Sequence, residues 1–108
     1  MAELHIKSLT CTNKQTTGTA KDRASLRVNG RKVSGPHILG KDKSVTLNLR
    51  HQFTNKVAVT LVEEDGNSAD DDLGSVIVRD TLVGKGNKTG HFDAAPHAKY
   101  EMTYNVLP

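Results

Sequence analysis

The residues of this chain most able to do chemistry are six carboxylates that fall within ten positions, from Glu63 to Asp72, with no basic residue among them. They follow an apolar run directly. Close like charges repel by about 1 kcal/mol per pair at ~4 Å in water. A hard cation such as Ca2+, which takes oxygen ligands in flexible geometry, relieves that repulsion. The segment therefore predicts a calcium site, and a solvated acidic loop that holds no metal is the alternative interpretation.

The spacing of the acids indicates which of them would be ligands. Alternate residues of a strand project to the same side, so Glu63 and Asp65 present two carboxylates together where the chain leaves a strand. A returning arm that carries Asp71 would close the site, with Asp70 or Asp72 assisting. We therefore expect oxygen ligands from a loop between two strands, completed by backbone carbonyls and water.

Strands must position this loop, because apolar and polar residues alternate with a period of two along most of the chain, as at 24–28, 45–49 and 100–106. Asn29-Gly30 is the favoured pair for a two-residue hairpin turn. The pattern predicts an all-β fold, a single eight-stranded antiparallel β-sandwich over residues 1–108. The expected strands cover 3–11, 22–28, 31–34, 43–49, 56–63, 74–80, 88–93 and 98–106.

The connections between these strands are distributed unevenly. If each strand crosses the sandwich once, the connections after odd-numbered strands lie at one end, and these are 12–21, 35–42, 63–73 and 94–97. Long polar connections at one end of a rigid scaffold are where binding residues usually gather. We therefore expect the acidic segment to share one end of the molecule with the other three connections.

One of these connections contains an apolar pair beside lysines. Ile38 and Leu39 are followed closely by Lys41 and Lys43. Two apolar side chains could dip into a membrane interface whose anionic lipids attract each base by about 1 kcal/mol. These four residues are therefore candidates for binding a lipid or another partner. The alternative is that Ile38 and Leu39 cap the end of the core.

The acidic segment resembles the third binding loop of the C2-type domains, which are calcium- and phospholipid-binding β-sandwiches. That loop reads D-x-D, five residues, D, two residues and Gly after an apolar strand. Counting back from Gly74 places acids at Asp71, Asp65 and Glu63, the last in place of an aspartate. Asp22, which precedes an extended segment, looks like an aspartate of the family's first loop.

The resemblance implies a non-enzymatic module that binds Ca2+ and then an anionic phospholipid or protein surface. It adds Asp22 to the ligands, and the bound ion would make the local potential less negative, so that such a surface can approach. The remaining attraction would come from Lys14, Lys21, Lys41 and Lys43. The alternative is a structural or interaction β-sandwich that binds a protein or glycan, in which calcium only stabilises a loop or is absent.

Composition limits the other classes. The net charge is +3, with most bases in 1–50 and most acids in 51–108. The bases are scattered in sequence, so we expect no specific nucleic-acid binding. A further alternative is that the basic residues of 1–50 bind an anionic polymer, which predicts salt-sensitive binding that does not need calcium. Cys11 is the single cysteine, which excludes an intrachain disulfide. We find no arrangement of residues typical of catalysis.

Targeting signals are not evident. No apolar leader precedes the first strand, and no apolar run approaches the roughly 18 residues that span a bilayer. We therefore expect a cytoplasmic protein that associates with membranes peripherally, with export by a route that needs no leader left open.

Overall fold

The strands predicted from the alternation are present in the computed structural model, which describes residues 1–16, 18–64 and 70–108. The described part contains eight strands and one short 3-10 helix, so the predicted all-β class is confirmed. The elements are β1 (Ala2–Asn13), β2 (Asp22–Val28), β3 (Arg31–Leu39), β4 (Lys43–Phe53), β5 (Lys56–Glu63), β6 (Asp71–Arg79), η1 (Asp80–Leu82), β7 (Lys88–Phe92) and β8 (Lys99–Leu107).

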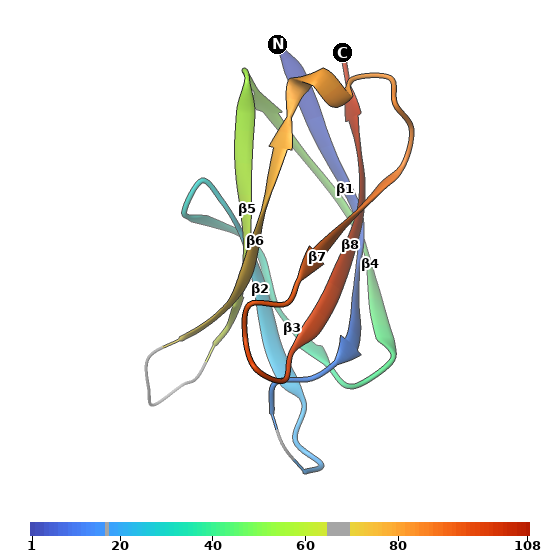
Figure 1. Cartoon of the computed structure of the whole chain (residues 1–108). Helices are drawn as coiled ribbons and strands as arrows, with labels where there is room; N and C mark the ends of the chain where they lie inside the picture. The colour runs from blue at the N-terminus through green and yellow to red at the C-terminus, as the bar shows by residue number, and fades with distance from the viewer. Residues whose placement is uncertain (17, 65–69) are drawn as a thin grey trace.

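The strands form two antiparallel sheets of four, ordered β4-β1-β8-β7 and β3-β2-β5-β6. The sheets pack face to face in a body of 43 × 25 × 22 Å, with both termini at one end (Figure 1). The described residues of the connections β1–β2, β3–β4, β5–β6 and β7–β8 lie at the other end, which we call the loop end. Strand parity had predicted this grouping, and the structure confirms it.

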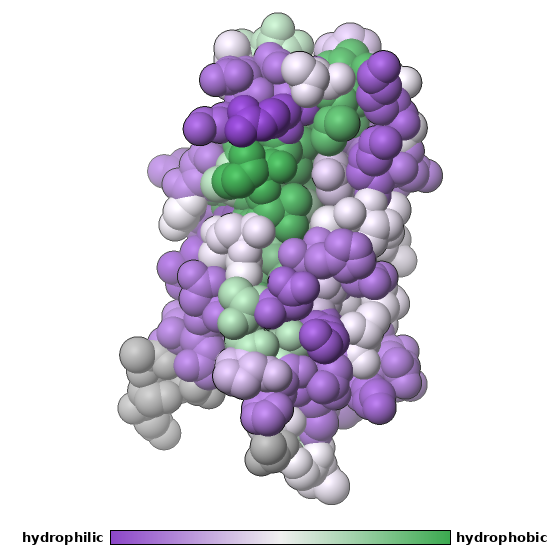
Figure 2. Space-filling view, viewed as in Figure 1, coloured by the Kyte–Doolittle hydropathy of each residue, from purple (hydrophilic) through white to green (hydrophobic). Residues whose placement is uncertain are grey.

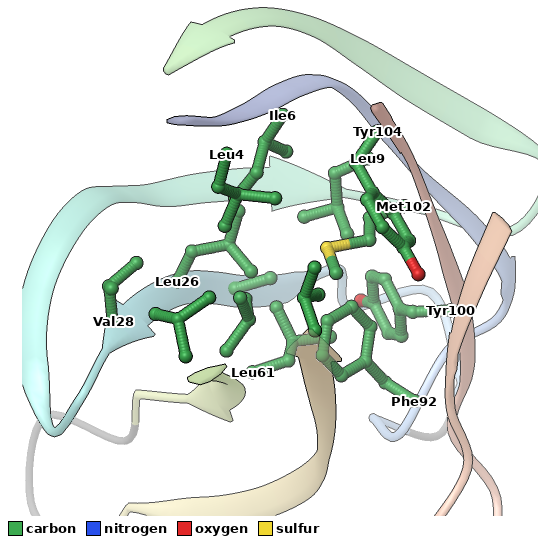
Figure 3. Close-up of a cluster of buried hydrophobic side chains, with 14 of the residues drawn as sticks. Leu4, Ile6, Leu9, Leu26, Val28, Leu61, Phe92, Tyr100, Met102 and Tyr104 are labelled. Carbon is green, nitrogen blue, oxygen red and sulfur yellow. The ribbon is translucent and has the colours of Figure 1, made fainter. Parts of the chain in front are cut away.

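The core lies between the sheets and follows from the alternation. Every second residue of β5 and β8 faces inward, and the fully buried side chains include Leu26 and Leu61 from one sheet and Tyr100 and Met102 from the other. Figure 3 shows these side chains meeting between the two layers, with the ring of Phe92 beside Tyr100. Burial of this apolar surface, at roughly 25 cal/mol per Å2, supplies most of the stabilisation and holds the strand ends in fixed positions.

The β2–β3 hairpin has the predicted turn but a longer second strand than expected. Asn29 and Gly30 both have positive φ, 50° and 84°, as a two-residue turn of this kind requires. The strand expected over 31–34 continues to Leu39, so the connection expected over 35–42 shrinks to 40–42. The Gly-Pro pair at 35–36 indicated a loop, yet Gly35, at φ 104°, lets β3 stay close to β2, since an added Cβ would lie 2.7 Å from the Ala24 carbonyl oxygen.

Two further boundaries differ from the sequence expectation by more than two residues. β4 continues to Phe53 instead of ending at 49, because its pairing with β1 extends to Ala2. β6 begins at Asp71 instead of 74, because Asp71 and Asp72 pair with Glu63 and Val62 of β5. Two of the candidate ligands therefore lie on a strand and not within a loop.

Candidate binding site at the loop end

Asp22, at the start of β2, is fully buried and holds the first loop in place. Its Oδ2 accepts hydrogen bonds from the Gln15 backbone N–H at 2.7 Å and from the Tyr100 hydroxyl at 2.6 Å, and its Oδ1 accepts one from the Thr16 N–H at 2.8 Å. Three donors compensate the cost of burying the carboxylate. Both oxygens of this predicted ligand are therefore already bound by the chain itself.

Tyr100 is a site residue that the sequence analysis missed. Burial raises the pKa of its hydroxyl, and the hydrogen bond to Asp22 raises it further. The neighbouring Cys11 is also buried, and desolvation raises the pKa of its thiol. The available signal was a tyrosine at an inward-facing position of the last strand, because a buried hydroxyl usually finds a hydrogen-bond partner.

Glu63 and Asp71 face one another across the β5–β6 ladder. Glu63 is only 4% exposed, and its Oε2 accepts a hydrogen bond of 2.6 Å from the Arg23 backbone N–H. Asp71 is exposed, and the next residue, Asp72, accepts a hydrogen bond of 2.8 Å from the Gly74 N–H. Directly opposed residues share one face of a sheet, and like charges there are destabilising.

Glu64 and Asp70 are each paired with a base of the β2–β3 hairpin. Lys32 Nζ lies 3.0 Å from Glu64 Oε2, and an Arg27 terminal nitrogen lies 3.3 Å from Asp70 Oδ2. Hydrogen bonds from the Ser25 hydroxyl and from Lys32 lower the pKa of Glu64. We call these the outer-face ion pairs, because they fasten both flanks of the segment to the outer face of the β2–β3 hairpin.

The predicted ligands are thus only partly brought together. Glu63 and Asp71 are opposed, Asp22 is engaged inside the domain, and Asp65 lies outside the described residues. Within 1–16, 18–64 and 70–108, no three His, Cys, Asp or Glu side chains form a group that could hold a metal ion. The ligand set therefore stays a prediction.

The residues predicted to touch a lipid or another partner separate into two kinds. Ile38 is 55% exposed, whereas its neighbour Leu39 is 4% exposed and belongs to the core. Lys41 and Lys43 are exposed at the β3–β4 connection, where Gly40 lies against the side chain of Lys21. The described part of the loop end therefore presents an exposed apolar side chain at Ile38, with exposed bases at Lys41 and Lys43 a few residues further along the chain.

Lys14 has a different environment. Its Nζ donates hydrogen bonds to the backbone oxygens of Gly18 and Ala20 and so stabilises its own loop. The larger apolar area in Figure 2 lies in the upper half of the face shown, away from the loop end. The described residues include no helix long and apolar enough to cross a membrane.

Comparison with known proteins identifies the fold. No family model matches the chain, and no curated protein matches its sequence. Among solved structures, a protein described as a C2 domain superposes with a TM-score of 0.63 at 11% identity, covering all of both chains. The calcium-bound C2A and C2B domains of extended synaptotagmin 2 give a TM-score of 0.56 at 16% identity, covering 97% of this chain and 44% of that one.

A third match, the human GIVD cytosolic phospholipase A2, has a TM-score of 0.58 at 15% identity and covers 98% of this chain but only 16% of that one. The likeness to these last two structures is therefore confined to less than half of their length. At these identities the comparison establishes the fold, and it agrees with the resemblance of the acidic segment. The chain therefore has the fold of the C2-type β-sandwich domains.

Proposed function

We propose that this domain is a non-enzymatic binding module whose loop end docks, in a calcium-dependent manner, on an anionic phospholipid or protein surface. The observation that carries the proposal is the opposition of Glu63 and Asp71 on adjacent strands. Such an arrangement of like charges favours a cation, which here would be Ca2+ because the donors are carboxylate oxygens.

The proposed ligands are Glu63, Asp65 and Asp71, with Asp70 or Asp72 assisting. Glu63, whose Oε2 accepts the Arg23 N–H, would contribute carboxylate oxygen to the ion. Asp22 would reach the ion only by giving up one of its three donors, so its main role in this proposal is to order the first loop. The ion would supply positive charge that offsets the acids and attracts an anionic group.

The surrounding residues fit an anionic partner. Ile38 is exposed near the end of β3, Lys41 and Lys43 follow it in the sequence, and the Lys21 side chain lies against Gly40. An apolar side chain beside lysines matches the interface of an anionic bilayer, where each base near the surface contributes about 1 kcal/mol.

A calcium titration followed by backbone amide NMR tests the metal site. We expect shifts confined to 12–22 and 62–74 in the wild type, and their loss when Glu63→Gln and Asp71→Asn are combined. The matched control combines Glu3→Gln and Glu101→Gln, which removes two charges from the outer face of the other sheet and should leave the shifts intact. A silent wild-type spectrum at millimolar calcium would remove the metal from the proposal.

Vesicle sedimentation tests the partner. We expect binding to phosphatidylserine-containing vesicles with calcium, and none with chelator or with pure phosphatidylcholine. Vesicle binding that is unaffected by chelator would contradict the calcium-dependent mechanism.

One observation favours the second candidate function, an interaction β-sandwich in which calcium only stabilises a loop or is absent. Asp22 and the outer-face ion pairs already neutralise several acids or satisfy their oxygens within the chain. That candidate predicts a first loop that is equally ordered with and without calcium, and no calcium-dependent vesicle binding.

A further inference from the structure

The connection between η1 and β7 is rich in glycine and lysine and contains no acid. Residues 84–88 read Gly-Lys-Gly-Asn-Lys, and the longer range 81–92 holds no aspartate or glutamate. Figure 1 shows this connection (orange) in the half of the molecule that carries the termini, away from the loop end. We call residues 84–88 the basic turn, and it shares no residue with the site of the proposed function.

The backbone of the basic turn leaves N–H groups available to a ligand. Gly84 and Gly86 have positive φ, 74° and 79°, whereas Lys85 between them does not. Turns whose residues alternate in this way direct successive N–H groups toward one side and form a concavity that binds anions. The Lys85 N–H donates a hydrogen bond of 3.1 Å to the Leu82 carbonyl oxygen. The N–H groups of Gly86 and Asn87 donate none within the described residues, so two adjacent donors are available.

The same backbone is open to solvent. Apart from the chain neighbours, no atom lies within 4 Å of a Cβ built at Gly84 or at Gly86. Lys85 and Asn87 are exposed as well. Because glycine has no side chain to keep a ligand away, an anion can approach these N–H groups directly, as it does in glycine-rich loops that bind phosphate.

Three lysines gather at the basic turn. Two of them, Lys85 and Lys88, belong to the turn itself. The third, Lys7 of β1, reaches it across β8, and its Nζ donates a hydrogen bond of 2.8 Å to Asn87 Oδ1. None of the three forms an ion pair within the described residues. Asp80, the nearest acid before the turn, instead accepts a backbone N–H at 3.0 Å. The described residues therefore leave this positive charge uncompensated.

We propose that the basic turn, together with Lys7, binds a phosphomonoester group. Such a group carries a charge of about −1.5 to −2 at pH 7 and presents three acceptor oxygens. The N–H groups of Gly86 and Asn87 would donate to this group, and the lysine ammonium groups would pair with it. A carboxylate carries a single charge and would leave most of the lysine charge unbalanced. The inference does not depend on calcium or on the loop end.

A backbone amide NMR titration with sn-glycerol 3-phosphate tests the site, with chelator present and the ionic strength held constant with sodium chloride. We expect saturable shifts at 84–88 and at Lys7. Dimethyl phosphate is the matched diester, and it should bind more weakly because it carries a single charge. The absence of saturable shifts at the basic turn, shifts centred on the loop end, or equal affinity for the two esters would overturn the proposal. Because calcium is absent, the result is separate from that of the calcium titration.

A double variant tests the lysines. Lys7→Gln combined with Lys85→Gln should weaken the binding of glycerol 3-phosphate at least roughly tenfold, because two charge-assisted contacts are lost. Lys41→Gln combined with Lys43→Gln is the control, because it removes two exposed lysines at the loop end and should bind like the wild type. Equal affinity of the two double variants would contradict the role of Lys7 and Lys85.

A glycine variant tests the backbone donors. Gly86→Ala strains the turn at φ 79° and should weaken binding, whereas Gly18→Ala, at φ 72° and with equally open surroundings, should not. The amide spectrum of each variant also reports whether it folds. A folded Gly86→Ala variant that binds like the wild type would show that the lysines act alone and would overturn the role given to the N–H groups.

Vesicles that contain phosphatidic acid distinguish the two sources of a phosphomonoester. With chelator present, sedimentation of the wild type that is lost in the Lys7→Gln and Lys85→Gln double variant assigns the site to a lipid headgroup. A wild type that binds glycerol 3-phosphate but does not sediment assigns the site to a soluble ester. Sedimentation that the double variant retains would contradict a headgroup at the basic turn.

Discussion

Tyr100 donates a hydrogen bond of 2.6 Å to Asp22, a residue 78 positions away in the sequence. The bond joins the last strand to the start of β2, across the two sheets, at the point where the first loop ends. Because Asp22 also accepts N–H groups from Gln15 and Thr16, the order of that loop depends on a carboxylate inside the domain.

Removing the Tyr100 hydroxyl should destabilise the fold. Tyr100→Phe leaves the buried Asp22 carboxylate with one donor fewer, which should lower the free energy of unfolding by about 1–3 kcal/mol. Urea denaturation measures this loss. Tyr104→Phe is the control, because burial alone raises the pKa of that tyrosine, and it should cost less. Equal losses for the two variants would contradict a specific role for the bond.

Glu64 should make stability depend on pH. The Ser25 hydroxyl and Lys32 lower its pKa in the folded state, so its contribution is present above the unfolded pKa of about 4.3 and is lost as pH falls through the lower folded value. Glu64→Gln should therefore reduce the acid-induced loss of stability, and Ser25→Ala should reduce it in part. Denaturation curves between neutral and acidic pH measure the effect. An unchanged slope in Glu64→Gln would contradict it.

Gly35 should be intolerant of a side chain. A Cβ there would lie 2.7 Å from the Ala24 carbonyl oxygen, in a backbone conformation with φ 104°. Gly35→Ala should therefore destabilise the domain by more than about 1 kcal/mol. Gly84→Ala is the control, because Gly84 also has positive φ but no atom within 4 Å of the added Cβ. Thermal unfolding should separate the two variants, and similar melting temperatures would show that the close approach is unimportant.

Ile38 and Leu39 should respond to substitution in opposite ways. Leu39→Ala opens a space in the core and should cost about 2–5 kcal/mol of stability, whereas Ile38→Thr changes an exposed side chain and should cost less than about 1 kcal/mol. If the loop end docks on anionic vesicles as proposed, Ile38→Thr should nevertheless weaken vesicle binding. Unchanged binding by a folded Ile38→Thr variant would exclude this residue from the interface.

Much of the fold was predictable because alternation reports directly on which residues face the core. The strands expected over 22–28 and 56–63 have the observed boundaries. Residues 35–39 were assigned to a connection because Gly-Pro is typical of turns. That local signal carries no information about the neighbouring strand β2. Gly35 lies close to the backbone of β2, which allows β3 to continue through it.

The candidate site was predictable where it depends on neighbouring strands. A returning arm that carries Asp71 back towards Glu63 follows from local sequence, but their pairing on the β5–β6 ladder does not, because β6 was expected to begin only at 74. The Tyr100–Asp22 bond and the outer-face ion pairs were not predictable, because they depend on how the two sheets pack and on the register of β2 with its neighbours. The alternation of apolar and polar residues determines neither the packing of the two sheets nor the register of β2.

The two acidic parts of the loop end differ in their sensitivity to ionic strength. Exposed ion pairs such as Lys32–Glu64 and Arg27–Asp70 weaken as added salt shortens the Debye length, which is about 8 Å under physiological conditions. The Asp22 carboxylate is shielded from mobile ions by burial. Added salt should therefore loosen the attachment of Glu64 and Asp70 to the β2–β3 hairpin, while the hydrogen bonds of Asp22 to the first loop persist. The outer-face ion pairs and the first loop thus respond independently to ionic strength.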